Sequence, residues 1–336
     1  MIIYTPPKAA TSIPVVDLAG SFSPDPAARK AVAWEIHKAA RDTGFFYIEN
    51  HGVPQAVLDS LLETAATFFA LPLEDKLAAD IKNSTCYRGY EPLAAQTLDE
   101  GSKPDNKEGF QIGRDLSAEH PKVVRGVANH GPNQWLPGMP EMRTELEDYR
   151  DRMTALGRHL LGLLALSLDQ PEDYFEPGFP EHVVTTRLLH YPPQPAVLEG
   201  NELGAGAHTD WGLITMLLQD EVGGLEVLNA DGDWIRAPHI PGTFVVNLGD
   251  LVPVLTNGLY RSNAHRVLNT AEVDRYSVPT FLDLDYDYVI EPVPGSLAAG
   301  EQSSQAITVG DHLAAMLHRT YTTVTPHRTR TTEIPA

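Results

Sequence analysis

A histidine and an aspartate lie two residues apart in the segment "GAHTDWGLITM", at His208 and Asp210, and His265 begins a second apolar run farther along the chain. In an extended strand, side chains two apart project from the same face, so the imidazole and the carboxylate would point toward one spot. Two histidines and one carboxylate on one face of a metal, with the opposite face open, are typical of non-haem iron(II) sites. An H-x-D pattern alone is weak evidence, because it occurs often by chance. The three residues together predict a metal centre.

An arginine and a serine are also two residues apart, at Arg275 and Ser277 in "RYSVPTF". The planar guanidinium binds a carboxylate through two parallel hydrogen bonds, and the hydroxyl adds a third on the same face. An unpaired arginine inside a sheet would be costly, so Arg275 needs an anionic partner. A protein carboxylate in a structural salt bridge would meet that need, and so would a bound dicarboxylate.

The elements that must position these residues change in character along the chain. The first half is predicted to be mostly helical, with irregular loops over residues 84–140 and its longest helical signal over residues 141–168. After about residue 183, short β-rich runs recur between turn signals, including a hairpin signal at Asp231 and Gly232. The segment "VGDHLAAMLHRTY" predicts a closing helix. Many short, evenly spaced strands are typical of a sandwich or barrel such as a jelly roll.

Composition narrows the class of partner. The chain has 336 residues, of which 42% are hydrophobic and 21% charged, and its formal net charge is −20. Phosphate contacts need Lys and Arg, so this charge argues against nucleic acid or an anionic membrane as a partner. One cysteine excludes an intramolecular disulfide and cysteine-based metal clusters. No secretory signal pattern and no apolar run near the ~20 residues of a membrane span are present, so we expect a cytoplasmic protein.

The order H-x-D, then H, then R-x-S resembles the iron(II)/2-oxoglutarate dioxygenases of the isopenicillin N synthase-like (plant-type) family. Other segments match that family in order, among them "IPVVDL", "DTGFFYIENHGVP", "NKEGFQIG", "LLHYPPQP" and "FVVNLGDLVPVLTNGLYRSNAHRV". The resemblance implies an α+β fold with a double-stranded β-helix (jelly-roll) core, a mainly helical N-terminal region and a C-terminal helix. It implies an N-terminal helical and loop region over residues 1–140. A dioxygenase region with a long support helix would follow over residues 141–336, and we expect one compact unit.

The resemblance also implies roles for individual residues. His208, Asp210 and His265 match the iron ligands, and Arg275 and Ser277 match the pair that holds the distal carboxylate of 2-oxoglutarate. Tyr191 matches a tyrosine whose hydroxyl usually joins that carboxylate. Two residues earlier, Leu189 stands where many plant members have asparagine, so one cosubstrate hydrogen bond is missing or supplied elsewhere. Phe281 matches an aromatic near the substrate. Trp211, which follows the ligand pair, is a candidate for the pocket wall or the core.

The family activity implies Fe(II), 2-oxoglutarate and O₂, with ascorbate as a candidate stimulant. The expected reaction oxidises an unactivated C–H bond of a small-molecule metabolite and releases succinate and CO₂. Hydroxylation is the common result, and desaturation or cyclisation are alternatives. We expect a monomer or a weak dimer. Two other hypotheses stay open: a 2-oxoglutarate-independent iron oxidase of the same fold, and a non-catalytic small-molecule binding protein.

Two further features receive structural interpretations. The sequence places Asp283, Asp285 and Asp287 on one face of a strand, where a solvated edge is a simpler interpretation than a cation site. His190 should point away from Tyr191 and serve packing.

Overall fold

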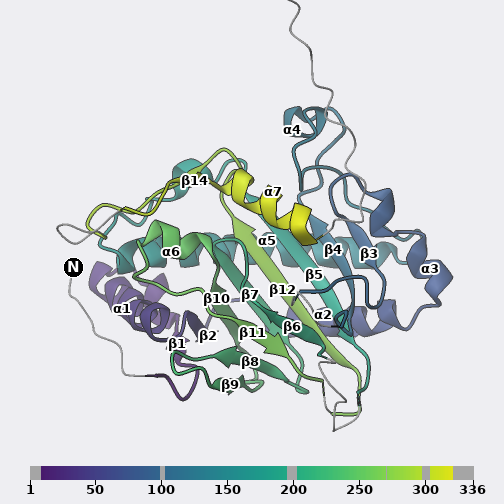
Figure 1. Ribbon diagram of the computed structural model, residues 1–336, viewed down its shortest axis with the longest axis horizontal. Coiled ribbons are helices and arrows are strands. Elements are labelled where there is room, and N and C mark those ends of the chain that lie inside the picture. Colours follow the sequence, from purple (N-terminus) through teal and green to yellow (C-terminus); the bar gives the residue numbers. More distant parts are fainter. Residues whose placement is uncertain (1–8, 99–102, 195–202, 270, 297–302, 321–336) are drawn as a thin grey trace, which may run out of the picture.

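The computed structural model describes residues 9–98, 103–194, 203–269, 271–296 and 303–320 (Figure 1). Its largest element is an eight-stranded sheet in the spatial order β1-β2-β10-β7-β12-β5-β4-β3. Figure 1 shows β10, β7, β12, β5 and β4 side by side across the middle of the molecule. The strands of this sheet are β1 (Val15–Asp17), β2 (Phe45–Glu49), β3 (Gly89–Glu91), β4 (Glu108–Gly113), β5 (Val183–Tyr191), β7 (Ile214–Gln219), β10 (Phe244–Leu248) and β12 (Arg275–Asp283).

A smaller sheet has four strands in the order β6-β11-β8-β9. These strands are β6 (Ala205–His208), β8 (Leu225–Leu228), β9 (Trp234–Ala237) and β11 (His265–Val267). The hairpin predicted at Asp231 and Gly232 is confirmed, because β8 and β9 pair antiparallel around it. A short ribbon pairs β13 (Val289–Ile290) with β14 (Ile307–Thr308).

The helical segment predicted over residues 141–168 forms α5 (Pro140–Ser167). Asp25 caps α1 by accepting a hydrogen bond from the backbone N–H of Ala27, and Pro54 precedes α2. The predicted closing helix is confirmed as α7, and Tyr321, the last residue of its predicted segment, lies outside the described residues. The α-helices are α1 (Pro26–Asp42), α2 (Gln55–Phe69), α3 (Leu73–Leu77), α4 (Pro121–Val124), α5 (Pro140–Ser167), α6 (Leu251–Leu255) and α7 (Val309–Thr320); the 3₁₀ helices are η1 (Ala19–Phe22), η2 (Ile81–Asn83) and η3 (Glu176–Gly178).

The large sheet is buried on both faces. On β10, Val246 packs into the core that includes α1, α2 and α5, whereas its neighbour Val245 packs toward the smaller sheet. On β5, Leu188 likewise packs into the helix-covered core and Leu189 packs toward the smaller sheet. Successive side chains of a strand point to opposite faces, and this explains why β7 and β10 are mostly apolar along their length. The face turned toward the smaller sheet carries the candidate site.

The loop prediction for residues 84–140 is wrong in part. The segment contains β3 and β4, and every residue of β4 is buried. Its sequence, "EGFQIG", is polar in places because Glu108 accepts a hydrogen bond from Lys76 of α3 and Gln111 donates one to the backbone carbonyl of Tyr87. Among the described residues, no helix is long and apolar enough to cross a membrane.

Candidate metal centre and pocket

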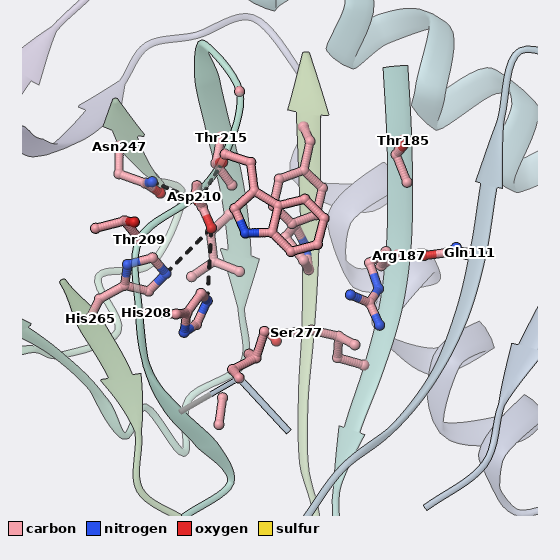
Figure 2. A pocket seen from close by; sticks show the side chains of 18 of the residues that line it. Gln111, Thr185, Arg187, His208, Thr209, Asp210, Thr215, Asn247, His265 and Ser277 are labelled. Carbon is pink, nitrogen blue, oxygen red and sulfur yellow. Dashed lines mark hydrogen bonds and ion pairs between the residues drawn. The ribbon is translucent and has the colours of Figure 1, made fainter. Parts of the chain in front are cut away.

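His208, Asp210 and His265 converge between the two sheets. A ligand atom from each lies within 4.8 Å of the other two. The Nε2 atoms of His208 and His265 are 3.8 and 3.7 Å from the same oxygen of Asp210. Figure 2 shows both imidazoles pointing toward that carboxylate. Two imidazole nitrogens and one carboxylate oxygen around a shared point fit a facially bound iron(II) ion.

The strand geometry differs from the sequence prediction at Asp210. His208 is the last residue of β6, and Asp210 lies beyond it in the following turn. β11 pairs with β6 so that His265 lies opposite His208, and this pairing brings the third ligand to the same place. The two residues converge because of the turn and the strand pairing, and an extended strand through both of them is not required.

Hydrogen bonds fix which ring nitrogens face the centre. Nδ1 of His208 lies 2.7 Å from the carbonyl oxygen of Gly206, and Nδ1 of His265 lies 3.4 Å from that of Asn263. A carbonyl accepts a hydrogen bond only from a protonated nitrogen, so the Nε2 lone pairs are left toward Asp210. Backbone carbonyls orient metal-binding histidines in this way in many metalloproteins.

Asp210 is held as an ionised carboxylate. Its second oxygen accepts hydrogen bonds from the hydroxyl of Thr215 at 2.6 Å and the amide of Asn247 at 2.7 Å. Burial raises the pKa of Asp210, but the two histidines and these hydrogen bonds outweigh it, so the net pKa shift is downward. Burial, followed by the neighbouring His265, lowers the pKa of His208. A neutral imidazole beside an ionised carboxylate is the protonation state that metal ligation needs.

Asp283 also stabilises the turn that carries Asp210. One carboxyl oxygen of Asp283 accepts a hydrogen bond from the backbone N–H of Leu213 at 2.7 Å. A Cβ at Gly212 would lie 2.2 Å from that oxygen, so only glycine leaves room for this contact. Burial raises the pKa of Asp283 to about 7.

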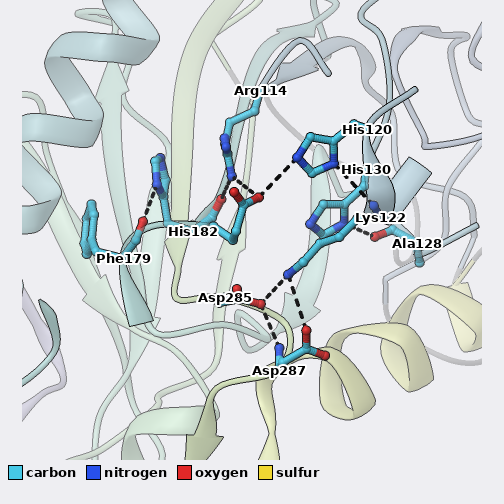
Figure 3. Close-up of polar contacts among 10 residues, drawn as sticks. Arg114, His120, Lys122, Ala128, His130, Phe179, His182, Asp285 and Asp287 are labelled. Carbon is cyan, nitrogen blue, oxygen red and sulfur yellow. Dashed lines mark hydrogen bonds and ion pairs between the residues drawn. The ribbon is translucent and has the colours of Figure 1, made fainter. Parts of the chain in front are cut away.

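The solvated-edge prediction for the three aspartates is therefore wrong for Asp283, which is 4% exposed and lines the pocket. It is also wrong for Asp285, which forms an ion pair with the buried amine of Lys122. Figure 3 shows Lys122 directed at both Asp285 and Asp287, and its nitrogen lies 3.7 Å from an Asp287 oxygen. Asp287 alone is largely solvated. The error has a simple cause: the strand β12 ends at Asp283, so the three residues do not share one extended face.

Arg275 and Ser277 line the same pocket as the metal centre. Arg275 is fully buried, donates through Nε to the carbonyl of Gly223, and places Nη1 3.3 Å from the hydroxyl of Ser277. Its guanidinium carbon lies 4.6 Å from the centre of the Tyr191 ring. Its Nη2 is buried without a hydrogen-bond partner, and no carboxylate among the described residues lies within ion-pair distance. The structural salt bridge that the sequence left open is absent from the described part of the chain.

Every second residue of β5 faces the pocket. Thr185, Arg187, Leu189 and Tyr191 line it, whereas His190 points to the other side. The ring of His190 stacks on that of Tyr276, in agreement with the packing interpretation. Its nitrogens also lie 2.8 Å from Glu108 and 2.7 Å from Asp274. Burial lowers the pKa of His190, but these carboxylates outweigh burial and the net pKa shift is upward.

Phe281 and Trp211 also line the pocket, as the sequence suggested. Sequence reasoning missed several polar lining residues. Alternation along β5 could have indicated Thr185 and Arg187 once Tyr191 was assigned to the pocket. Further polar residues reach the pocket through long-range strand pairing, which no local sequence pattern predicts. Among them are Gln111, Asn129, Thr215, Asn247 and Asp283.

Comparison with known proteins agrees with this geometry. Two family models match the chain: the N-terminal region described as non-haem dioxygenase in morphine synthesis, over residues 13–138, and the 2OG-Fe(II) oxygenase superfamily, over residues 181–284. The chain is 40% identical to the 2-oxoglutarate-Fe(II) type oxidoreductase hxnY of Emericella nidulans, over 93% of this chain and 91% of that protein. It is 39% identical to the 2-oxoglutarate-dependent dioxygenase citB of Monascus ruber, over 94% of this chain and 97% of that protein.

A full-length Neurospora crassa protein, solved as a crystal structure in complex with alpha-KG (2-oxoglutarate) and thymine, has a TM-score of 0.80 to this chain. The two sequences are 28% identical, and the match covers 91% of this chain and 96% of that one. The likeness confirms the predicted double-stranded β-helix core.

Proposed function

Because the chain belongs to the 2OG-Fe(II) oxygenase superfamily, we propose that it oxidises an unactivated C–H bond of a small-molecule metabolite, with hydroxylation as its main outcome. The protein is a 2-oxoglutarate-dependent dioxygenase that uses Fe(II) and 2-oxoglutarate. One observation carries the finer proposal: a buried arginine whose described hydrogen-bond partners are all neutral shares a pocket with the His208, Asp210 and His265 centre. Succinate and CO₂ are the coproducts of this reaction.

The residues present fit both groups. The centre offers two imidazoles and one ionised carboxylate, which is the donor set of a non-haem iron(II) site with open positions. Arg275 offers a guanidinium whose Nη2 still needs an acceptor, beside the hydroxyl of Ser277. A carboxylate is the acceptor that a buried guanidinium favours most strongly.

When bound, iron(II) supplies the redox chemistry that couples decarboxylation of 2-oxoglutarate to oxidation of the substrate. The chain's own residues bind and orient the reactants. Arg275 and Ser277 hold the distal carboxylate, with Tyr191 beneath the guanidinium. Trp211 and Phe281 form apolar walls that position the substrate and exclude water from the centre. Thr215 and Asn247 keep the Asp210 carboxylate in place through the cycle.

The neighbouring structure with thymine supports a small molecule as the substrate. A substrate of similar size would lie between the metal centre and the polar end of the pocket around Arg187 and Gln111.

The test measures succinate release by iron(II)-loaded protein supplied with 2-oxoglutarate and a panel of small metabolites. We expect at least one compound to raise succinate release well above the uncoupled background and to gain one oxygen atom. His208→Ala serves as the inactive control. Substrate oxidation without matching succinate would contradict the proposal and favour the 2-oxoglutarate-independent oxidase. Binding of metabolites without any oxidation would favour the non-catalytic binding protein.

A further inference from the structure

The cations that line the pocket differ in their partners. Among the described lining residues these are Lys107, Arg187 and Arg275. Lys107 forms a buried ion pair with Asp105, and Arg187 forms one with Glu91. The described hydrogen-bond partners of Arg275 are neutral. Within the described part of the chain, Arg275 therefore has no counter-charge within ion-pair distance, whereas Lys107 and Arg187 each have one.

The pair of Arg187 and Glu91 is built into the sheet. The Nη2 of Arg187 lies 2.5 Å from a Glu91 oxygen, and the side chains are 12% and 6% exposed. Glu91 lies on β3 and Arg187 on β5, with β4 between them. Gly109 of β4 is the register partner of Glu91. A Cβ at Gly109 would lie 3.5 Å from Nη2 of Arg187, at ordinary van der Waals distance, so Gly109 lies directly beside the ion pair.

Gln111 lies beside this guanidinium as the register partner of Arg187 (Figure 2). Its amide nitrogen donates to the backbone carbonyl of Tyr87. Its oxygen is therefore left as an acceptor next to the donors of Arg187. A guanidinium donor beside an amide acceptor matches a ligand group that carries a carbonyl next to an N–H.

We propose that the substrate presents an uncharged amide-type group, such as an amide, imide or lactam, to Arg187 and Gln111, with the rest of the molecule lying against Trp211 and Phe281. This inference rests on the proposed function, because it names the substrate class of the same pocket. A carboxylate at this place would share one guanidinium with Glu91, so two negative charges would be desolvated against one positive charge. A neutral carbonyl accepts the same hydrogen bonds without that cost.

The experiment measures binding by titration calorimetry to the anaerobic protein loaded with iron(II) and 2-oxoglutarate. The probes are matched pairs of flat molecules: benzamide with benzoate, and nicotinamide with nicotinate. We expect each amide to bind at least about tenfold more tightly than its acid. The affinity for 2-oxoglutarate is measured in every variant as the control for folding.

Glu91→Gln removes the counter-charge and keeps the size of the side chain. We expect the affinity of this variant for the acids to rise at least about tenfold, so that the preference for amides is lost or reversed. Glu91→Asp keeps the charge and should keep the preference for amides. Arg187→Met provides an independent test should Glu91→Gln fail to bind 2-oxoglutarate: amide binding should weaken to the level of acid binding.

Three results would overturn the inference. The first is tighter binding of the acids than of the amides to the unchanged protein. The second is no detectable binding of any amide at millimolar concentration. The third is an unchanged preference for amides over acids in both Glu91→Gln and Arg187→Met, with both variants still binding 2-oxoglutarate. Failure of the proposed function is distinct, because a protein that ranks the probes as expected but never releases succinate would contradict the oxygenase proposal alone.

Discussion

Replacing Arg275 tests whether this side chain binds the distal carboxylate of 2-oxoglutarate. The guanidinium is fully buried, its Nη2 has no hydrogen-bond partner, and its other described partners are the carbonyl of Gly223 and the hydroxyl of Ser277. Truncating one member of a buried charged pair costs about 2–5 kcal/mol. Arg275→Ala should therefore weaken the affinity for 2-oxoglutarate by a factor between roughly 30 and several thousand.

Two further variants separate lost hydrogen bonds from lost packing. Arg275→Met keeps most of the volume of the stem over the Tyr191 ring but has no donors, so it should bind 2-oxoglutarate as weakly as Arg275→Ala. Arg275→Lys keeps the charge but loses the planar fork, so it should recover only part of the affinity. Titration calorimetry on iron(II)-loaded protein measures all three. Iron content should not change, because the ligand atoms belong to His208, Asp210 and His265.

The reasoning would be refuted by a folded Arg275→Ala protein whose 2-oxoglutarate affinity falls less than about tenfold. It would also be refuted if Arg275→Met restored the affinity, because the loss would then come from a cavity. An effect confined to the primary substrate would assign Arg275 to the substrate and reopen the oxidase hypothesis.

Three more predictions follow from the site. His208→Ala, Asp210→Ala and His265→Ala should each hold less than about a tenth of the normal iron by metal analysis and keep an unchanged circular dichroism spectrum; full activity at that iron content would remove the residue from the ligand set. Leu189→Asn should leave 2-oxoglutarate affinity unchanged or improve it, because Leu189 lines the pocket opposite Ser277, and a sharp loss would assign the position to packing. His190 has a raised pKa, so the stability it contributes is fully present below its ordinary value of 6.5 and is lost as pH rises through the raised value. The difference in thermal midpoint between the unchanged protein and His190→Gln should therefore shrink as pH rises from about 6 to about 9, and a constant difference would contradict the ion-pair assignment.

Local sequence patterns predicted the parts of the fold that depend on local chemistry. The helix α1 was predictable because Asp25 and Pro26 form an N-terminal capping signal. The hairpin was predictable because Asp231 and Gly232 lie between two apolar runs, and Gly232 takes the positive φ that glycine favours. The strand β4 was missed because the apolar alternation in "EGFQIG" is limited to Phe110 and Ile112 and is flanked by glycines. Its polar residues are satisfied by partners far away in the sequence, and single-sequence patterns do not contain that information.

The same division applies to the site. The H-x-D and R-x-S spacings predicted which side chains come together, although His208 and Asp210 do so across the end of β6 and not along one strand. The supporting residues Thr215, Asn247 and Asp283 come from three different strands, and only the sheet register brings them to the Asp210 turn. Asp283 illustrates the limit: in sequence it is one of three regularly spaced aspartates, and in the structure the end of β12 separates it from the other two.

The register between β5 and β12 gives the pocket a direction. Arg275 lies opposite Tyr191 at one end, Ser277 lies opposite Leu189, and Phe281 lies opposite Thr185 toward the other end. Arg187 lies on β5 between Leu189 and Thr185, so the row of Leu189 and Ser277 separates it from Arg275. Arg275 still needs a negative charge, whereas Arg187 already has one from Glu91. An anionic cosubstrate would therefore be disfavoured beside Arg187, and a neutral substrate beside Arg275. On this proposal, the pairing of β5 with β12 sets the orientation in which the two molecules meet at the metal centre.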